Sequence, residues 1–225
     1  MGILDIIYPR LCVSCKRLGG YICSDCLHKL HLKRFQICPV CTKRSINGAT
    51  HLRCKRLYGM DGLTSVFVYQ GVVRKLVGKL KYGLVSDLKD DLLELMASFG
   101  DFVVIASQKW LVTAVPLHVA RARERGFNQA ELLAYAISEY FGWPVENKIL
   151  SRNTKTVKQM NLNKKERLAN VRAAFEISED MKKVVAGKRI LLVDDVWTTG
   201  ATLRENAKML KRAGAKVVWG LAFAA

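Results

Sequence analysis

Apolar residues in the C-terminal three quarters of this 225-residue chain follow two alternating patterns. Short continuous apolar runs, typical of buried strands, alternate with longer segments in which apolar residues recur every three or four positions, as in amphipathic helices. The predicted strands are residues 63–69, 111–115, 189–193 and 216–223. The predicted helices carry Val73, Leu76, Val77 and Leu80; Leu88, Leu92, Leu95 and Phe99; Leu132, Leu133, Ala136, Ile137 and Tyr140 after a start near Asn128; and residues 202–213. This alternation predicts an α/β fold with a mainly parallel sheet that helices cover on both faces.

The first 57 residues lack this pattern and contain all seven cysteines, from Cys12 to Cys54. A segment with so few large apolar side chains cannot bury enough surface to fold without further stabilisation. We therefore predict two domains, a small one over residues 1–57 and a main one over residues 58–225.

Six of the cysteines form three C-x-x-C pairs, a spacing that is typical of structural zinc sites. The first two pairs supply one set of four thiolates: Cys12, Cys15, Cys23 and Cys26. The third pair leaves only one further cysteine, and His51 stands three residues before it, so the second predicted set is Cys38, Cys41, His51 and Cys54. Structural zinc contributes an apparent ~10–16 kcal/mol to folding, which would compensate for the small core of this segment.

Three alternatives to this assignment stay open at the level of sequence. The first and third pairs could share one ion, His28 or His31 could replace His51, and some cysteines could be ordinary small buried side chains. Each alternative predicts a different grouping of sulfur and nitrogen donor atoms in the folded chain.

Charge adds a second property, because 37 Lys and Arg against 19 Asp and Glu give a formal net charge of +18. Such an excess favours acidic partners, and it is densest in the N-terminal quarter. No run approaches the ~18 apolar residues that span a bilayer, and the N-terminal residues do not resemble a signal peptide. We predict a soluble, cytoplasmic protein with no membrane insertion.

The string RILLVDDVWTTGATL, residues 189–203, places two carboxylates and a Thr- and Gly-rich turn between a strand and a helix. The turn and the helix N-terminus offer N–H groups to a phosphate dianion. Carboxylates beside a phosphate would repel it, but they suit the hydroxyls of a ribose that carries that phosphate. A metal-binding strand end or a merely capped helix is the alternative.

This string resembles the phosphoribosyl diphosphate (PRPP) signature of type I phosphoribosyltransferases. By that resemblance Asp194 and Asp195 contact the ribose hydroxyls. The residues placed at the 5′-phosphate are Thr198, Thr199, Gly200, Ala201 and Thr202.

Two basic segments fit the same site. Pro116, Leu117 and His118 follow a predicted strand and would lie over the pyrophosphate, with Arg121, Arg123 and Arg125 near it, since guanidinium groups suit phosphate oxygens. Residues 151–172 look like the hood over the reaction centre of these enzymes, with candidate contacts Lys158, Gln159, Arg167, Asn170 and Arg172. The alternatives are an exposed basic loop and a solvated linker.

Together with LKYG at 80–83, RERGFNQAELL at 123–133 and ERLANVRAAF at 166–175, these motifs resemble the ComF (ComFC) family over essentially the entire chain. The resemblance implies a double zinc ribbon ahead of a type I phosphoribosyltransferase-like domain, zinc in the ribbon and Mg²⁺ with PRPP. It also implies a role in natural transformation, with single-stranded DNA and a ComFA-type helicase ATPase as partners. The chain departs from the family pattern at His51, at Trp197 and at Gly83, which leaves the contribution of Lys81 and Tyr82 open.

Three functions compete at this stage. One is an enzyme that transfers phosphoribose from PRPP, although no general base is evident. Another is a pocket that binds PRPP or a nucleotide without turnover in a DNA-uptake factor. The last is nucleobase salvage, which leaves the ribbon and the basic excess unexplained.

Overall fold

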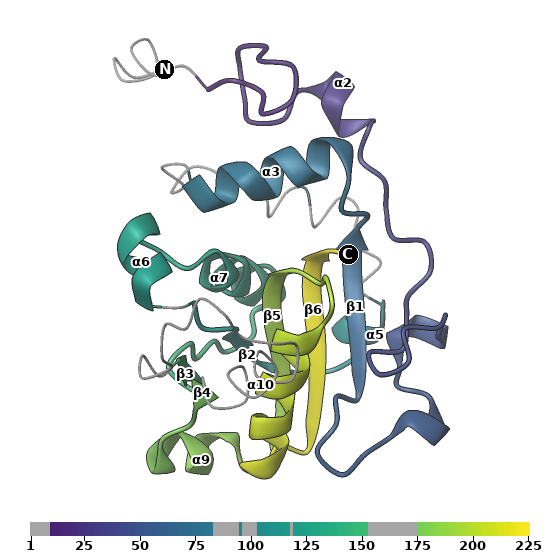
Figure 1. Ribbon diagram of the computed structural model, residues 1–225, viewed down its shortest axis with the longest axis vertical. Coiled ribbons are helices and arrows are strands. Elements are labelled where there is room, and N and C mark those ends of the chain that lie inside the picture. The colour runs from purple at the N-terminus through teal and green to yellow at the C-terminus, as the bar shows by residue number, and fades with distance from the viewer. Residues whose placement is uncertain (1–9, 83–94, 96–102, 118, 153–174) are drawn as a thin grey trace, which may run out of the picture.

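The computed structural model describes residues 10–82, 95, 103–117, 119–152 and 175–225. A four-stranded sheet lies at its centre, with the strand order β1-β6-β5-β2 and every neighbouring pair parallel (Figure 1). The strands are β1 (Gly62–Phe67), β2 (Leu111–Ala114), β5 (Arg189–Val196) and β6 (Val217–Ala224). All four carboxyl ends therefore lie at one edge of the sheet, where ligands of α/β proteins bind.

Successive residues of the central strands enter two separate cores. Leu191 and Val193 pack in the core beneath α3 (Gly71–Tyr82) and α7 (Gln129–Phe141), whereas Ile190 and Leu192 pack in the core beneath α10 (Ala201–Arg212). Side chains alternate along a strand, so a continuous apolar run is the pattern that a sheet covered on both faces requires. The predicted fold class is confirmed.

The remaining helices and strands are short. They are α2 (Ser24–Leu27), η1 (Ile46–Gly48), η2 (Leu52–Cys54), α5 (Val103–Ala106), α6 (Val119–Arg125), α9 (Glu179–Val185) and the antiparallel pair β3 (Ser151–Arg152) and β4 (Phe175–Glu176). The last two flank a segment outside the described residues. In the described part of the chain, no helix has the length and apolar character needed to cross a membrane.

The N-terminal segment runs along the outer edge of β1 (Figure 1). The N–H of Lys33 donates to the carbonyl of Val66, and the N–H of Val68 donates to the carbonyl of His31. The Gln36 side chain also bonds both backbone groups of Ser65, accepting at 2.8 Å and donating at 2.9 Å. The cysteine-rich segment therefore covers an edge that the sheet would otherwise leave unpaired.

Most predicted elements are present within one or two residues. The run at 189–193 is longer than predicted, because β5 continues through Asp194 and Asp195 to Val196, so both carboxylates lie within the strand. The predicted helix over Leu88 to Phe99 lies outside the described residues except for Leu95, which is helical. Residues 119–125, for which no helix was predicted and an exposed basic loop was the alternative, form helix α6.

Candidate metal centres and phosphate-binding site

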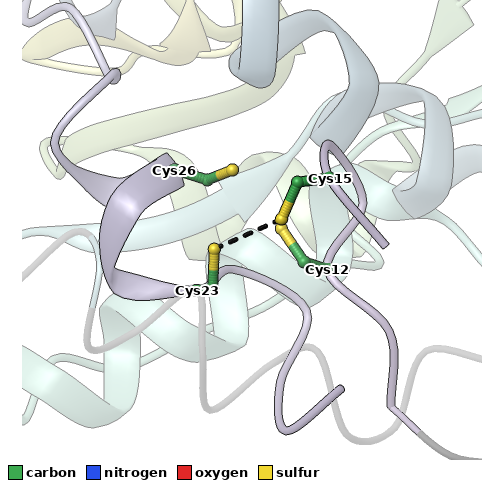
Figure 2. Close-up of side chains that lie close together, drawn as sticks. All are labelled: Cys12, Cys15, Cys23 and Cys26. Atoms are coloured by element: carbon green, nitrogen blue, oxygen red, sulfur yellow. Dashed lines mark hydrogen bonds between the residues drawn. The ribbon is translucent and has the colours of Figure 1, made fainter. Parts of the chain in front are cut away.

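The first cysteine cluster brings two pairs of thiols together from opposite sides (Figure 2). Cys12 and Cys15 come from a loop, Cys23 precedes α2, and Cys26 lies within that helix. Their four sulfur atoms lie within 4.8 Å of one another, with 3.4 Å between the Sγ atoms of Cys15 and Cys23. The predicted ligand set Cys12, Cys15, Cys23 and Cys26 is thus assembled in the fold.

The second cluster contains Cys38, Cys41, His51 and Cys54, whose donor atoms also lie within 4.8 Å of one another. The Nδ1 atom of His51 faces the sulfur of Cys41 at 3.3 Å, and its Nε2 lies 3.1 Å from the carbonyl oxygen of Arg44. An Nε2–H donated to this carbonyl would leave Nδ1 free to bind a metal, which is the usual arrangement of a histidine ligand.

Both donor sets fit zinc. Tetrahedral zinc with Zn–S bonds of about 2.3 Å places its sulfur ligands roughly 3.8 Å apart, close to the separations within each cluster. The interleaved pairing is wrong, because the first and third pairs lie in different clusters. His28 and His31 lie outside both clusters, and Nδ1 of His28 instead contacts the carbonyl of Ser24 at 2.7 Å.

The thiols of each cluster differ in acidity. Burial acts to raise the pKa of Cys12, but backbone N–H groups of Cys15 and Cys23 stabilise the thiolate and lower the pKa to about 6. Burial and the neighbouring thiols raise the pKa of Cys26 to about 12. In the second cluster, backbone N–H groups outweigh burial and lower the pKa of Cys38 to about 7, whereas burial raises the pKa of Cys54. Metal binding must therefore release protons from the less acidic thiols.

The second candidate site lies at the carboxyl ends of β5 and β2. Asp194 and Asp195 are partly buried near the end of β5, and the N–H of Asp195 donates to Oδ1 of Asp194 at 2.9 Å. Lys81, in the last turn of α3, pairs with Oδ2 of Asp195 at 3.1 Å. Lys81 is a site residue whose contribution the sequence left open, because nothing in the chain pattern links it to a residue 114 positions later.

The two carboxylates have different surroundings. Burial, with the charge of Asp195 beside it, raises the pKa of Asp194 well above its usual range. Lys81 lies against Asp195 and balances its charge. A polar ligand that donates hydroxyl hydrogens to this pair would relieve the repulsion between the carboxylates.

The turn after β5 ends at the N-terminus of α10. Thr198 and Thr199 are exposed, and Gly200 adopts the left-handed conformation with φ of 71° and ψ of 7°. The N-cap residue, Gly200, has no side chain to cap the helix, while Oγ1 of Thr199 accepts from the N–H of Ala201 at 3.4 Å, and the first turn has no acidic residue. The turn and helix thus present N–H groups and a positive dipole end to the same edge as the two carboxylates.

Trp197 lies beneath this turn rather than over it. Its indole is 5% exposed and packs with the α10 core. A Cβ at Gly200 would lie 2.2 Å from the Trp197 ring, so glycine is required there by space as well as by φ. The departure from the family pattern at Trp197 is accommodated by packing.

The loop after β2 begins beside the carboxylates, because the N–H of Val115 donates to the carbonyl of Val193. Pro116 and Leu117 follow and are partly buried. Asn128, buried at the N-cap of α7, donates from Nδ2 to the carbonyl of Val115 and accepts from the N–H of Ala130. Asn128 therefore ties the start of α7 to this loop, a role that its position in the sequence did not reveal.

The three arginines after the loop lie on α6 and do not all face one way. Arg121 and Arg125 are four residues apart and share a helix face, whereas Arg123 points elsewhere. Arg121 and Arg123 are exposed, and Arg125 donates to Oε1 of Gln129 at 3.2 Å. Their contact with pyrophosphate stays a prediction. His118 and the hood residues Lys158, Gln159, Arg167, Asn170 and Arg172 lie outside the described residues.

Comparison with known families assigns both parts of the chain. Residues 3–57 match the double zinc ribbon domain, and residues 127–223 match the phosphoribosyl transferase domain. The fold and its sites thus define a protein with a double zinc ribbon ahead of a phosphoribosyltransferase-type domain.

Three relatives narrow the class to a family. Competence protein F of Haemophilus influenzae is 40% identical over 113 residues, which span 49% of this chain and only about half, 49%, of that protein. DNA utilization protein YhgH of Salmonella typhi is 30% identical over 223 residues, which cover 93% of this chain and 94% of the relative. Competence protein ComFC of Bacillus subtilis is 28% identical over 204 residues, covering 86% of this chain and 79% of the relative. The chain belongs to the family of competence protein F, ComFC and YhgH.

Two solved structures align with 65% of this chain and 30% of their own length. One is the allosteric regulatory enzyme of purine biosynthesis, with a TM-score of 0.42 and 22% identity. The other is glutamine PRPP amidotransferase from B. subtilis in complex with ADP and GMP, with a TM-score of 0.44 and 23% identity.

Proposed function

We propose that this protein acts in DNA uptake during natural transformation, that the edge of its sheet binds PRPP or a nucleotide through its 5′-phosphate, and that its ribbon binds single-stranded DNA. The observation that carries the proposal is the position of two adjacent carboxylates, Asp194 and Asp195, at the end of β5, which the turn to the N-terminus of α10 follows.

The phosphate part of this site rests on α10 and its preceding turn. The N-terminal N–H groups of a helix and the positive end of its dipole favour a dianion, and hydroxyls of Thr198, Thr199 and Thr202 add donors. Gly200 supplies the positive φ with which the chain enters the first turn of α10. The first turn of α10 has no acidic residue that would oppose the anion.

The carboxylates give the site its selectivity for ribose. Carboxylates accept hydrogen bonds from hydroxyls, and a 2′,3′-diol one sugar away from the 5′-phosphate supplies two. In a DNA strand the 2′-hydroxyl is missing and O3′ is esterified. A DNA strand in this site would therefore place a negatively charged phosphodiester beside Asp194, which would repel it. The pocket therefore suits a free phosphoribosyl group, and Mg²⁺ would enter with the pyrophosphate of PRPP. The candidate contacts to that pyrophosphate are Pro116, Leu117, His118, Arg121, Arg123, Arg125 and Gln159.

Single-stranded DNA is assigned to the ribbon because of its charge. Residues 26–60 contain Lys29, Lys33, Arg34, Lys43, Arg44, Arg53, Lys55 and Arg56 but no Asp or Glu. Phe35 is 55% exposed, with the Arg44 guanidinium 3.8 Å from its ring centroid, and Tyr58 is 42% exposed. Exposed aromatic rings among cations can stack on bases while lysines and arginines neutralise phosphates. In this role the protein would act in the cytoplasm beside a ComFA-type helicase ATPase.

Titration calorimetry with PRPP and Mg²⁺ tests the pocket. Wild-type protein should bind, and the doubly substituted Asp194→Asn/Asp195→Asn protein should bind at least about tenfold more weakly, since it loses two charge-assisted hydrogen bonds. Equal binding by both proteins would overturn the assignment of the ribose hydroxyls to these carboxylates.

A second candidate function is an active phosphoribosyltransferase of nucleobase salvage, favoured by the match to the transferase domain. Transfer would displace pyrophosphate from the anomeric carbon of PRPP, and the protein would act by positioning and charge neutralisation. Incubating PRPP and Mg²⁺ with a panel of purine and pyrimidine bases and measuring released pyrophosphate separates the two functions. Base-dependent release identifies an enzyme, whereas binding without release identifies a pocket that only binds.

Fluorescence anisotropy with a labelled oligothymidylate tests the DNA surface. Affinity should fall steeply between low and moderate salt, with a logarithmic slope of about −0.7 for each phosphate neutralised. A salt-independent affinity would contradict an electrostatic ribbon surface. The Lys55→Ser/Arg56→Ser protein should show a shallower slope and an unchanged affinity for PRPP.

A further inference from the structure

The second metal cluster contacts the helix that begins at the phosphate turn. Arg204 lies in the first turn of α10, and its Nε donates to the carbonyl oxygen of Pro39 at 2.5 Å. Pro39 stands between the ligands Cys38 and Cys41. One side chain therefore joins the tip of the second zinc knuckle to the start of α10.

The same guanidinium also contacts the residue that supports the turn. The Cζ atom of Arg204 lies 5.1 Å from the ring centroid of Trp197, which is buried beneath Gly200. The Trp197 ring fills the space where a Cβ at Gly200 would lie. A continuous set of contacts thus runs from Pro39 through Arg204 and Trp197 to Gly200.

Charge favours this contact when the second cluster holds its ion. Zinc with three thiolates and one neutral imidazole carries a net charge of about −1. Arg204 is partly buried, and burial lowers the pKa of its guanidinium, whereas a negative charge on Cys38 acts in the opposite direction. Without the second cluster, the half-buried guanidinium of Arg204 would have only water as a partner on the side of Pro39, which is less favourable for a buried charge.

We propose that Arg204 is a positioning residue that couples the second zinc site to the phosphate turn. The ordered knuckle holds the guanidinium against Trp197, and Trp197 fixes the backbone at Gly200, which sets the direction of the N–H groups that follow. The part of this inference that concerns a ligand rests on the proposed function, whereas the coupling between the knuckle and Trp197 does not.

The chain offers a matched control for Arg204. Arg212 lies on the same helix, and its guanidinium also lies over an aromatic ring, 5.5 Å from the centroid of Tyr58. It is at the last residue of α10, away from the phosphate turn. Arg204→Met and Arg212→Met thus remove the same charge and keep a similar apolar stem.

The first test follows the indole N–H of Trp197 by ¹H–¹⁵N NMR, with the signal assigned from a Trp197→Phe protein. Arg204→Met should shift this signal and the amide signals of Thr199 and Gly200, whereas Arg212→Met should leave them unchanged. Zinc content should stay at the wild-type level in both proteins. An unmoved Trp197 signal in Arg204→Met would overturn the coupling, and this test needs no ligand.

The second test measures the affinity for ribose 5-phosphate by calorimetry. Arg204→Met should bind at least about fivefold more weakly, within the range of ordinary site-to-site coupling, while Arg212→Met should bind like the wild type. Arg204→Lys, which keeps the charge but not the planar group, should lie between. If the wild type binds ribose 5-phosphate and Arg204→Met binds equally well, the coupling to the pocket is refuted. If the wild type binds none, the proposed function fails and the NMR result still decides the coupling.

The third test disrupts the two metal clusters one at a time. His51→Ala should shift the Trp197 signal, and Cys15→Ser in the first cluster should not. Equal effects of both substitutions would contradict a specific connection. If His51→Ala fails to fold, the Trp197 signal of Arg204→Met, which leaves every metal ligand in place, decides whether the connection exists.

Discussion

Gly200 combines two requirements at one position, a positive φ and the absence of a side chain. Alanine at a φ of 71° costs about 1–2 kcal/mol, and forcing a methyl group into the Trp197 ring adds roughly 1–3 kcal/mol. The turn therefore depends on the residue beneath it as much as on its own backbone.

We predict that Gly200→Ala lowers the free energy of unfolding by about 2–4 kcal/mol, measured by urea denaturation. Gly187→Ala provides the control, because Gly187 has the same φ of 71° but no atom within 4 Å of its Cβ position. It should lose only about 1–2 kcal/mol. Equal losses would mean that the Trp197 contact contributes nothing, and in a double-mutant cycle Gly200→Ala should cost less in a Trp197→Leu background than in the wild type.

Asp194 should make stability depend on pH. Because its folded-state pKa is raised, the folded protein holds this proton more tightly than the unfolded chain, whose pKa is about 3.9. Stability is therefore lost as pH rises from about 4 through the folded pKa. Asp194→Asn should thus be more stable than wild type at pH 7, by on the order of 1 kcal/mol, with the difference fading toward pH 4.

Thermal unfolding of both proteins across this pH range checks the prediction. Asp195→Asn should gain less, because it also removes the partner of Lys81. If the stability difference between wild type and Asp194→Asn does not change with pH, the raised pKa of Asp194 is not its cause.

Among the elements, the second metal cluster differs from the first in that His51 takes the place of a fourth cysteine. His51 presents Nδ1 to Cys41 and Nε2 to the carbonyl of Arg44, an arrangement that the sequence could not show. The spacing H-x-x-C alone suggested that imidazole replaces a thiolate.

Mass spectrometric metal analysis should find about two zinc ions per wild-type chain and about one in His51→Ala, since three thiolates alone leave an open position. His51→Cys should restore the second ion. His28→Ala, which alters a histidine outside both clusters, should keep two. Retention of both ions by His51→Ala would remove His51 from the ligand set.

The helices and strands differ in how readily the chain pattern predicts them. β5 and β6 lie between two cores, so their continuous apolar runs were unambiguous. Helix α6 was not predicted because its sequence, VARARER, has charged residues at four of its last five positions and so lacks the apolar repeat that indicates a helix. β3 and β4 have two residues each, too few to show any alternation.

At the scale of the whole molecule, the candidate site was predictable where its chemistry is local in sequence. The zinc ligands and the residues from Asp194 to Thr202 are close together along the chain, so spacing identified them as candidates, and the fold then settled which cysteines and which histidine lie together. Lys81, Asn128 and Arg204 act across the fold, with partners 114, 13 and 165 positions away. Such long-range contacts depend on how the strands and helices are arranged in space, and the spacing of residues along the chain does not specify that arrangement.

The basic excess also divides over the molecule. Two zinc ions would add four positive charges, and the seven cysteines would add seven negative charges as thiolates, while His51 stays neutral. The formal net charge of +18 would therefore fall by about three. The loaded ribbon stays basic, and the cations of α6 lie near a different site. We therefore expect phosphate ligands and DNA to bind without direct competition.

The pairing of residues 31–36 with β1 has a consequence for handling the protein. A fragment limited to residues 58–225 would keep the sheet but expose the N–H and C=O groups along one side of a fully buried strand, Gly62–Phe67. Such an uncovered strand is a template for another copy. In size-exclusion chromatography, this fragment should elute as an oligomer at concentrations where the full chain elutes as a smaller species. If both elute with the same number of copies, the uncovered edge of β1 does not cause self-association. If the fragment self-associates, the ribbon prevents edge-to-edge polymerisation of the sheet in addition to binding metal.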